Sequence, residues 1–104
     1  MQTRSDDVFR ALADEQRRLV VRYLMDDADG VASYRDVADH LSAHSAAGPT
    51  EAMLTLRHAI LPMLAETGVV RYDSEQERIS YRSHPGVEDM LAVVEDALVS
   101  VEDE

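Results

Sequence analysis

Residues 56–73 read LRHAILPMLAETGVVRYD. Apolar side chains recur at helical spacing as far as Leu64, and Gly68 follows as a C-terminal stop signal. The next residues, VVRYD, alternate in the manner of a β-strand, and a second such run, RISYR, comes at 78–82 after the turn SEQE. The stretch therefore predicts a helix that ends at a glycine and continues directly into a two-stranded hairpin.

Pro62 interrupts the helical part of this stretch. It lacks the amide that would bond to the carbonyl of His58, and its ring crowds that carbonyl, so we expect a bend or a split in the helix. A helical wheel places Pro62 on the polar side with Thr55 and His58, where a bend disturbs packing least. Thr50 is the expected N-cap, which predicts a distorted helix over 50–67.

Three further helices are predicted towards the N-terminus. Ser5 is the expected N-cap of the first, DDVFRALAD, Asp14 of the second, EQRRLVVRYLMDD, and Ser33 of the third, YRDVADHLSAH. Gly30 separates the second helix from the third, and SAAGPT at 45–50 has the composition of a loop. This order predicts a mainly α chain with a two-stranded β-hairpin, which is an α+β fold class.

The charge pattern bears on possible partners. The chain has 104 residues, 21 acidic residues and ten basic ones, and its formal net charge is −11. Every basic residue is Arg, and none of them falls within 85–104, which holds seven acidic residues. A lysine-free, acidic chain resembles proteins of haloarchaea, whose cytoplasm is rich in salt. In molar salt the Debye length is about 3 Å, so acidity alone does not exclude binding to a nucleic acid.

Several classes of protein are disfavoured by what the sequence lacks. It contains no cysteine, which excludes disulfides and thiolate metal sites. No signal-peptide pattern and no apolar run long enough to span a bilayer occur, so we expect a cytoplasmic protein. No glycine-rich phosphate loop and no recognisable pairing of a nucleophile with a base is present. We therefore expect no enzymatic activity and no cofactor.

Two segments carry a resemblance to a known family. ALADEQRRLVVRYL at 11–24, followed by LRHAILPMLAETGVVRYD, is similar to the small winged helix-turn-helix proteins of haloarchaea, which are distantly similar to the ArsR, MarR and PadR transcriptional regulators. The resemblance covers residues 8–82. It implies a DNA-binding domain over 1–84 in which the fourth helix enters the major groove and the hairpin, as the wing, lies over the backbone or minor groove.

The candidate DNA-binding residues share a charged or hydrogen-bonding side chain on the third helix, the fourth helix or the hairpin. They are Arg35, Thr50, Thr55, Arg57, His58, Arg71, Arg78 and Arg82. Arginine suits both phosphate and guanine. Strand alternation places the three hairpin arginines on one face, whereas the wheel places Arg57 inside the apolar arc of its helix. The alternative for each arginine is an ordinary pairing with a surface carboxylate.

A second polar set lies on the third helix. Asp36, His40 and His44 recur at intervals of four residues, so they share one helical face and could hold a metal or contact phosphate. Two histidines with no third His or Cys nearby are more typical of a solvated helix face. We therefore expect no metal site.

The C-terminal segment 85–104 has the pattern of an acidic amphipathic helix. Its apolar residues step by four and three residues, as in a coiled-coil seam: Val87, Leu91, Val94, Leu98 and Val101. We expect this helix to pair with a second copy of the chain, and the alternative is docking on the chain's own first helix. The sequence thus favours a homodimeric, sequence-specific transcriptional regulator that binds double-stranded DNA. The alternative function is a winged-helix protein-protein interaction module that does not bind DNA.

Overall fold

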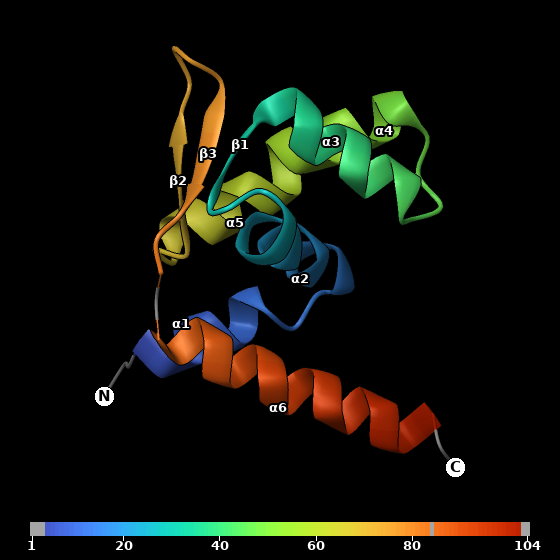
Figure 1. Ribbon diagram of the computed structural model, residues 1–104, viewed down its shortest axis with the longest axis vertical. Helices are drawn as coiled ribbons and strands as arrows, with labels where there is room; N and C mark the ends of the chain where they lie inside the picture. The colour runs from blue at the N-terminus through green and yellow to red at the C-terminus, as the bar shows by residue number, and fades with distance from the viewer. Residues whose placement is uncertain (1–3, 84, 103–104) are drawn as a thin grey trace.

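The computed structural model describes residues 4–83 and 85–102 (Figure 1). In chain order the elements are α1 (Arg4–Ala11), α2 (Glu15–Arg22), the π-helical turn η1 (Tyr23–Asp27), β1 (Val31–Ser33), α3 (Tyr34–Ala43), α4 (Pro49–Thr55), the π-helical turn η2 (Leu56–Ile60), α5 (Leu61–Glu66), β2 (Val70–Asp73), β3 (Arg78–Tyr81) and α6 (Pro85–Glu102). The chain is mainly helical with a small antiparallel sheet, which confirms the α+β class. Across the described residues, no helix combines the length and the apolar character that crossing a bilayer requires.

The sheet has three strands in the order β1-β3-β2. The β2–β3 hairpin has the predicted faces, with Tyr72 opposite Ile79 on the buried side. The expectation of only two strands was wrong, because β1 pairs with the other edge of β3 and sets Ala32 opposite Ile79. A strand of three residues is too short to show a period of two in the sequence. Its pairing partner in β3 is what makes it a strand.

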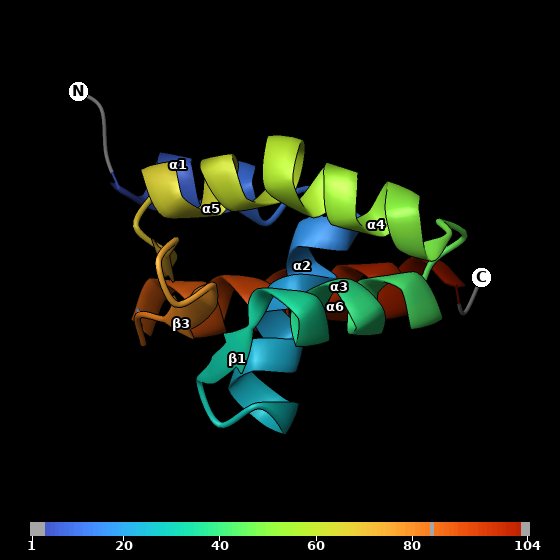
Figure 2. The same cartoon turned by 90° about the horizontal axis from the view of Figure 1, so that it is seen from above.

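The segments α4, η2 and α5 follow one another without a break and form one long helix (Figure 2). The π-helical turn η2 ends just before Pro62, and across it the amide of Leu61 donates to the carbonyl of Leu56. Pro62 is exposed, as expected. The helix absorbs the missing amide of the proline by widening one turn instead of breaking.

Both ends of this helix follow local chemistry. Gly68 adopts a φ of 81° just after the helix and allows the chain to turn into β2. The N-terminal prediction was wrong, because Gly48 is the N-cap and Pro49 the first helical residue, which leaves Thr50 inside the first turn. Proline suits that position because its fixed φ is already helical and its missing amide has no bond to make there.

Of the other three predicted N-caps, two are confirmed and one was wrong. The Oδ2 of Asp14 accepts from the amide of Arg17 at 3.1 Å, and the Oγ of Ser33 accepts from the amide of Asp36 at 3.0 Å, which confirms both N-caps. The expectation for Ser5 was wrong, because α1 begins at Arg4 and therefore includes Ser5. Arginine is a good helix former, so a helical residue at position 4 is consistent with its propensity.

A single cluster of buried apolar side chains joins the helices to the sheet. The helix α6 takes part in it, because Val87 and Leu91 are both 0% exposed and α6 packs against α1. This overturns the expectation that those two positions of the seam face a second chain. They fill the chain's own core, as the alternative of docking on the first helix predicts. The predicted segments 1–84 and 85–104 therefore do not have separate hydrophobic cores.

The rest of the seam differs from its first half. Val94 is half-buried, and the side chain of Leu98 is 45% exposed. The side chain of Val101 lies outside those that the structure describes. Among the seam side chains that the structure describes, Val87 and Leu91 therefore lie in the core, and exposure increases from Val94 to Leu98.

Candidate nucleic-acid interface

The helices and the hairpin that carry the candidate residues lie on one side of the molecule. Figure 1 places α3, α4 and the tip of the hairpin at the top and α1 and α6 at the bottom. Figure 2 looks onto the first side, where α3 and the long helix run across the view and β3 lies at one end. We call the exposed surface of α3, of α4–α5 and of the hairpin tip the α3–α4 face.

Five of the eight candidate residues belong to the helices of this face. Thr50, Arg57 and His58 are exposed on the long helix and Thr55 is half-buried, while Arg35 is exposed in the first turn of α3. The wheel was wrong for Arg57, because Leu56 and Ile60 take the buried positions on either side of it. The π-helical turn changes the angle between successive residues, which a regular wheel does not allow for.

Tyr34 holds Arg57 in place. The hydroxyl of Tyr34 donates to the carbonyl of Met53, which ties the start of α3 to α4. The ring of the same tyrosine lies under the guanidinium of Arg57, whose Cζ is 5.2 Å from the ring centroid. Such a cation–π contact restrains the guanidinium while leaving its hydrogen-bond donors free. Tyr34 is also a buried core residue, and no sequence pattern indicates its contact with Arg57.

The three hairpin arginines form a separate group. Arg71 and Arg78 are exposed, with Arg71 opposite Ser80 and Arg78 opposite Asp73, so they share the outer face of the sheet as predicted. The inner face packs on the helices, and the outer face consequently points away from α4–α5. Arg82 follows β3 at the end far from the hairpin tip, where its amide donates to the carbonyl of Val69. Only Arg78 thus lies next to the tip.

The hairpin tip has its own internal bonds. The Oδ1 of Asp73 accepts from the amides of Glu75 and Gln76 at 3.1 and 3.3 Å, which makes this acid part of the turn. The carbonyl of Glu77 accepts from the amide of Tyr34 at 2.8 Å. The tip is therefore joined to the start of α3, beside Arg35.

The arginines of α2 have a structural role. Arg17 donates from Nε to the carbonyl of Ala11 at 2.7 Å, and Arg18 donates from Nη1 to the carbonyl of Leu12 at 2.9 Å. These carbonyls lie at the C-terminal end of α1, where a helix leaves acceptors without intrahelical partners. Both side chains therefore fasten α1 to α2.

Arg22 connects α2 to α6. Its Nε donates to the Oε2 of Glu95 at 3.1 Å, and its Nη2 bonds to the other carboxylate oxygen, so the pair is bidentate. The hydrogen bonds from Arg22 lower the pKa of Glu95. Both side chains are about a third exposed, which limits what the pair adds to stability.

The candidate arginines differ from those of α2. Within residues 4–83 and 85–102, ion pairs join Arg22 to Asp26 and to Glu95, and none involves the five candidate arginines of α3, η2 and the hairpin. The alternative, in which each candidate arginine pairs with a surface carboxylate, is therefore not observed among the described residues, although the chain carries a large excess of acids.

His40 and His44, at the C-terminal end of α3, form a stack of rings with Tyr23. The ring of His40 lies 4.2 Å from that of Tyr23 and 4.2 Å from that of His44, between centroids. Burial lowers the pKa of His40, and His44 lowers it further. Among the described residues, no group of three or more His, Cys, Asp or Glu side chains could hold a metal ion.

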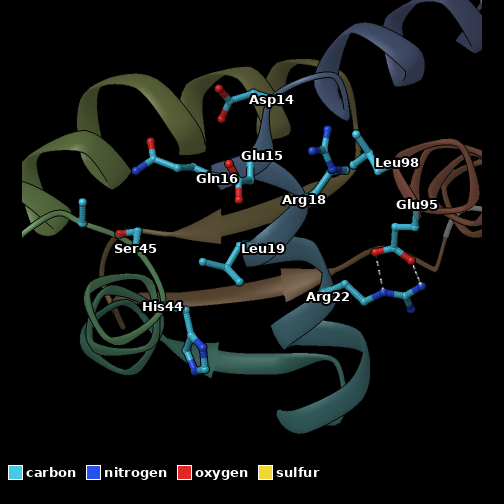
Figure 3. Close-up of a pocket in the computed structure, with 11 residues that line it drawn as sticks. Asp14, Glu15, Gln16, Arg18, Leu19, Arg22, His44, Ser45, Glu95 and Leu98 are labelled. Carbon is cyan, nitrogen blue, oxygen red and sulfur yellow. Dashed lines mark hydrogen bonds and ion pairs between the residues drawn. The ribbon is translucent and has the colours of Figure 1, made fainter. Parts of the chain in front are cut away.

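Two hollows accompany these elements. The larger, about 580 Å³, lies between the start of α2, the loop after α3 and the second half of α6, and we call it the α6 groove (Figure 3). Leu19, Arg18 and Leu98 are among its lining residues. The smaller, about 160 Å³, is almost entirely apolar, and we call it the tyrosine groove. It is lined by Tyr34, Arg57, Leu61, Pro62, Ala65 and Tyr72.

These features define a small α+β domain with a helical surface whose arginines form no ion pair with the residues that the structure describes. A family model described as a domain of unknown function (DUF7344) matches residues 9–80. Because this match spans more than half of the chain, the protein belongs to that family. Neither the curated proteins nor the solved structures gave a match.

Proposed function

We propose that the protein is a sequence-specific DNA-binding regulator of transcription with a winged helix-turn-helix architecture. In this assignment α3 and α4–α5 are the helix-turn-helix pair, α4–α5 is the recognition helix and the β2–β3 hairpin is the wing. The element order and the sheet order β1-β3-β2 support the assignment, because they set the wing beside the C-terminal end of the recognition helix. The acidic composition fits a regulator that works in the concentrated salt of a haloarchaeal cytoplasm.

The observation that carries this proposal is the contrast between the two sets of arginines. Arg17, Arg18 and Arg22 are engaged within the protein, whereas the candidate arginines have no carboxylate partner within residues 4–83 and 85–102. A chain with 21 acidic and ten basic residues offers carboxylate partners readily. Leaving cations unpaired there is consistent with an external anion such as phosphate.

The positions of the side chains suggest separate roles. Arg57 projects from the recognition helix and suits a guanine edge, with Thr50, Thr55 and His58 as neighbouring hydrogen-bonding groups. Arg35 lies in the first turn of α3, and Arg78 lies next to the hairpin tip that is joined to it, so both suit phosphate. Arg71 and Arg82 lie farther from the hairpin tip and contribute less to a single protein–DNA contact.

One observation favours the alternative of a protein-binding module. Met53 and Leu54, on α4, are 38% and 53% exposed. Exposed apolar side chains on a helix can form the centre of a protein interface.

Selection from random double-stranded DNA in molar KCl distinguishes the two functions. We expect an enriched consensus that contains a guanine, because Arg57 presents its donors from the recognition helix. Salt at this concentration removes binding that depends only on long-range attraction. The absence of any enriched sequence in both molar and lower KCl would refute the DNA-binding function and leave the protein-binding module.

We further propose that the regulator is a homodimer joined through the second half of α6. This part of the helix runs past α1 and α2 (Figure 1), and Leu98 lies at the α6 groove together with Leu19 (Figure 3). In such a dimer the two-fold axis passes beside the second half of α6 and runs perpendicular to the α3–α4 face, so both of these faces point in one direction. Two recognition helices can then reach half-sites about 34 Å apart on one duplex.

Leu98→Glu is expected to abolish the dimer and leave the monomer folded, because Leu98 is 45% exposed in the single chain. Val93→Glu is the matched control, since Val93 is also on α6, is 64% exposed and does not line the α6 groove. Analytical ultracentrifugation over a KCl series measures the association. We expect wild-type association to strengthen with salt, because screening weakens the repulsion between two acidic segments. A dimer that survives Leu98→Glu would place the interface elsewhere.

A further inference from the structure

The tyrosine groove lies beside Arg57, at the junction of α3, the recognition helix and the wing. The rings of Tyr34 and Tyr72 are 6.2 Å apart between centroids and form two of its walls. Leu61, Pro62 and Ala65 supply the side formed by the recognition helix. The hollow is therefore an apolar site with one cationic side chain at its edge.

In the major groove, the apolar feature that a base presents is the C5-methyl group of thymine, whereas guanine presents two acceptors that match an arginine fork. A cationic fork beside an apolar hollow is complementary to guanine beside thymine. We infer that the tyrosine groove receives the 5-methyl group of a thymine near the guanine that Arg57 contacts. This inference rests on the proposed DNA-binding function and adds the base class that the groove would select.

The spacing along the helix limits how far apart the two bases lie. Arg57 and Leu61 are four residues apart, so they are separated by at most about 6 Å along the helix axis, the rise of four residues in an α-helix. Successive base pairs are separated by about 3.4 Å along the duplex axis. The thymine is therefore expected within about two base pairs of the guanine.

The test uses the full-length wild-type chain and the consensus duplex selected from random DNA. Each thymine is replaced singly by uracil, which removes one methyl group and keeps every hydrogen-bonding group. We expect one replacement near the guanine to weaken binding about three- to ten-fold, the effect of leaving a single buried methyl unfilled. Replacements elsewhere in the duplex are expected to leave the affinity unchanged.

A variant whose side chain fills the groove provides an independent test. Ala65 lines the groove and is exposed, so Ala65→Leu is expected to fill it and remove the thymine-over-uracil preference while the guanine preference remains. Ala92→Leu is the control, because Ala92 is also an exposed helical alanine but lies on α6, outside the α3–α4 face and the groove. Circular dichroism and denaturant unfolding verify that both variants fold.

The results of these experiments distinguish failure of this inference from failure of the DNA-binding function. If the wild type binds a consensus but every uracil duplex binds equally well, the groove does not receive a thymine and the DNA-binding function stands. If Ala65→Leu keeps the full thymine preference, the inference is also overturned. If no DNA is bound at all, the proposed function fails, and the inference fails with it.

Discussion

Truncation of Leu91 to Ala is expected to lower the free energy of unfolding by about 2–5 kcal/mol, the range for large-to-small changes at fully buried positions. Leu91 is 0% exposed and belongs to the same cluster as the core residues of the other helices. A domain of this size has a total stability on the order of 5–15 kcal/mol, so the loss would be a large share of it. Urea unfolding followed by far-ultraviolet circular dichroism in molar KCl measures the change.

Leu98→Ala is the matched control for this experiment. It removes the same atoms from the same helix, but the side chain is 45% exposed, so we expect a loss of less than about 1 kcal/mol in the monomer. Repeating the measurement at two protein concentrations separates monomer stability from association, because only a dimer gains stability with concentration. Equal effects of the two substitutions would show that α6 is not anchored at Leu91.

Replacing Arg57 by Ala is expected to weaken binding to the selected DNA about 10- to 100-fold, since a good bidentate contact to guanine contributes about 1–3 kcal/mol of discrimination. The loss should be confined to duplexes that contain the guanine. Arg57→Lys should keep much of the non-specific affinity and lose the guanine preference, because lysine carries the charge without the planar fork. Gel shifts or fluorescence anisotropy with matched and mismatched duplexes measure both effects.

Arg10→Ala provides the charge-matched control. Arg10 is exposed on α1, on the opposite side of the molecule from the α3–α4 face (Figure 1), so its removal changes the net charge equally but should leave DNA affinity unchanged. Equal weakening by both substitutions would indicate that overall charge matters and not the position of Arg57. Unchanged affinity of Arg57→Ala would remove this residue from the interface.

Much of the local structure follows from the sequence because it depends on neighbours in the chain. The caps at Asp14 and Ser33 are bonds between a side chain and an amide three residues away, which a sequence pattern can predict. Gly68 allows the positive φ that leads from helix to strand, and Pro62 distorts the helix that contains it. The hairpin and its two faces follow from the alternation of apolar and polar residues along the two strands.

Other features of the fold and of the candidate site depend on contacts between distant segments. The strand β1 exists because β3 offers an edge nearly fifty residues away in the chain, and the core takes up Val87 and Leu91 because α1 lies beside α6. The π-helical turn brings Arg57 to the surface and Tyr34 holds it there, although the regular wheel buried it. Periodicity identifies apolar faces, but only tertiary packing determines which partner covers each face and which polar side chains are left exposed.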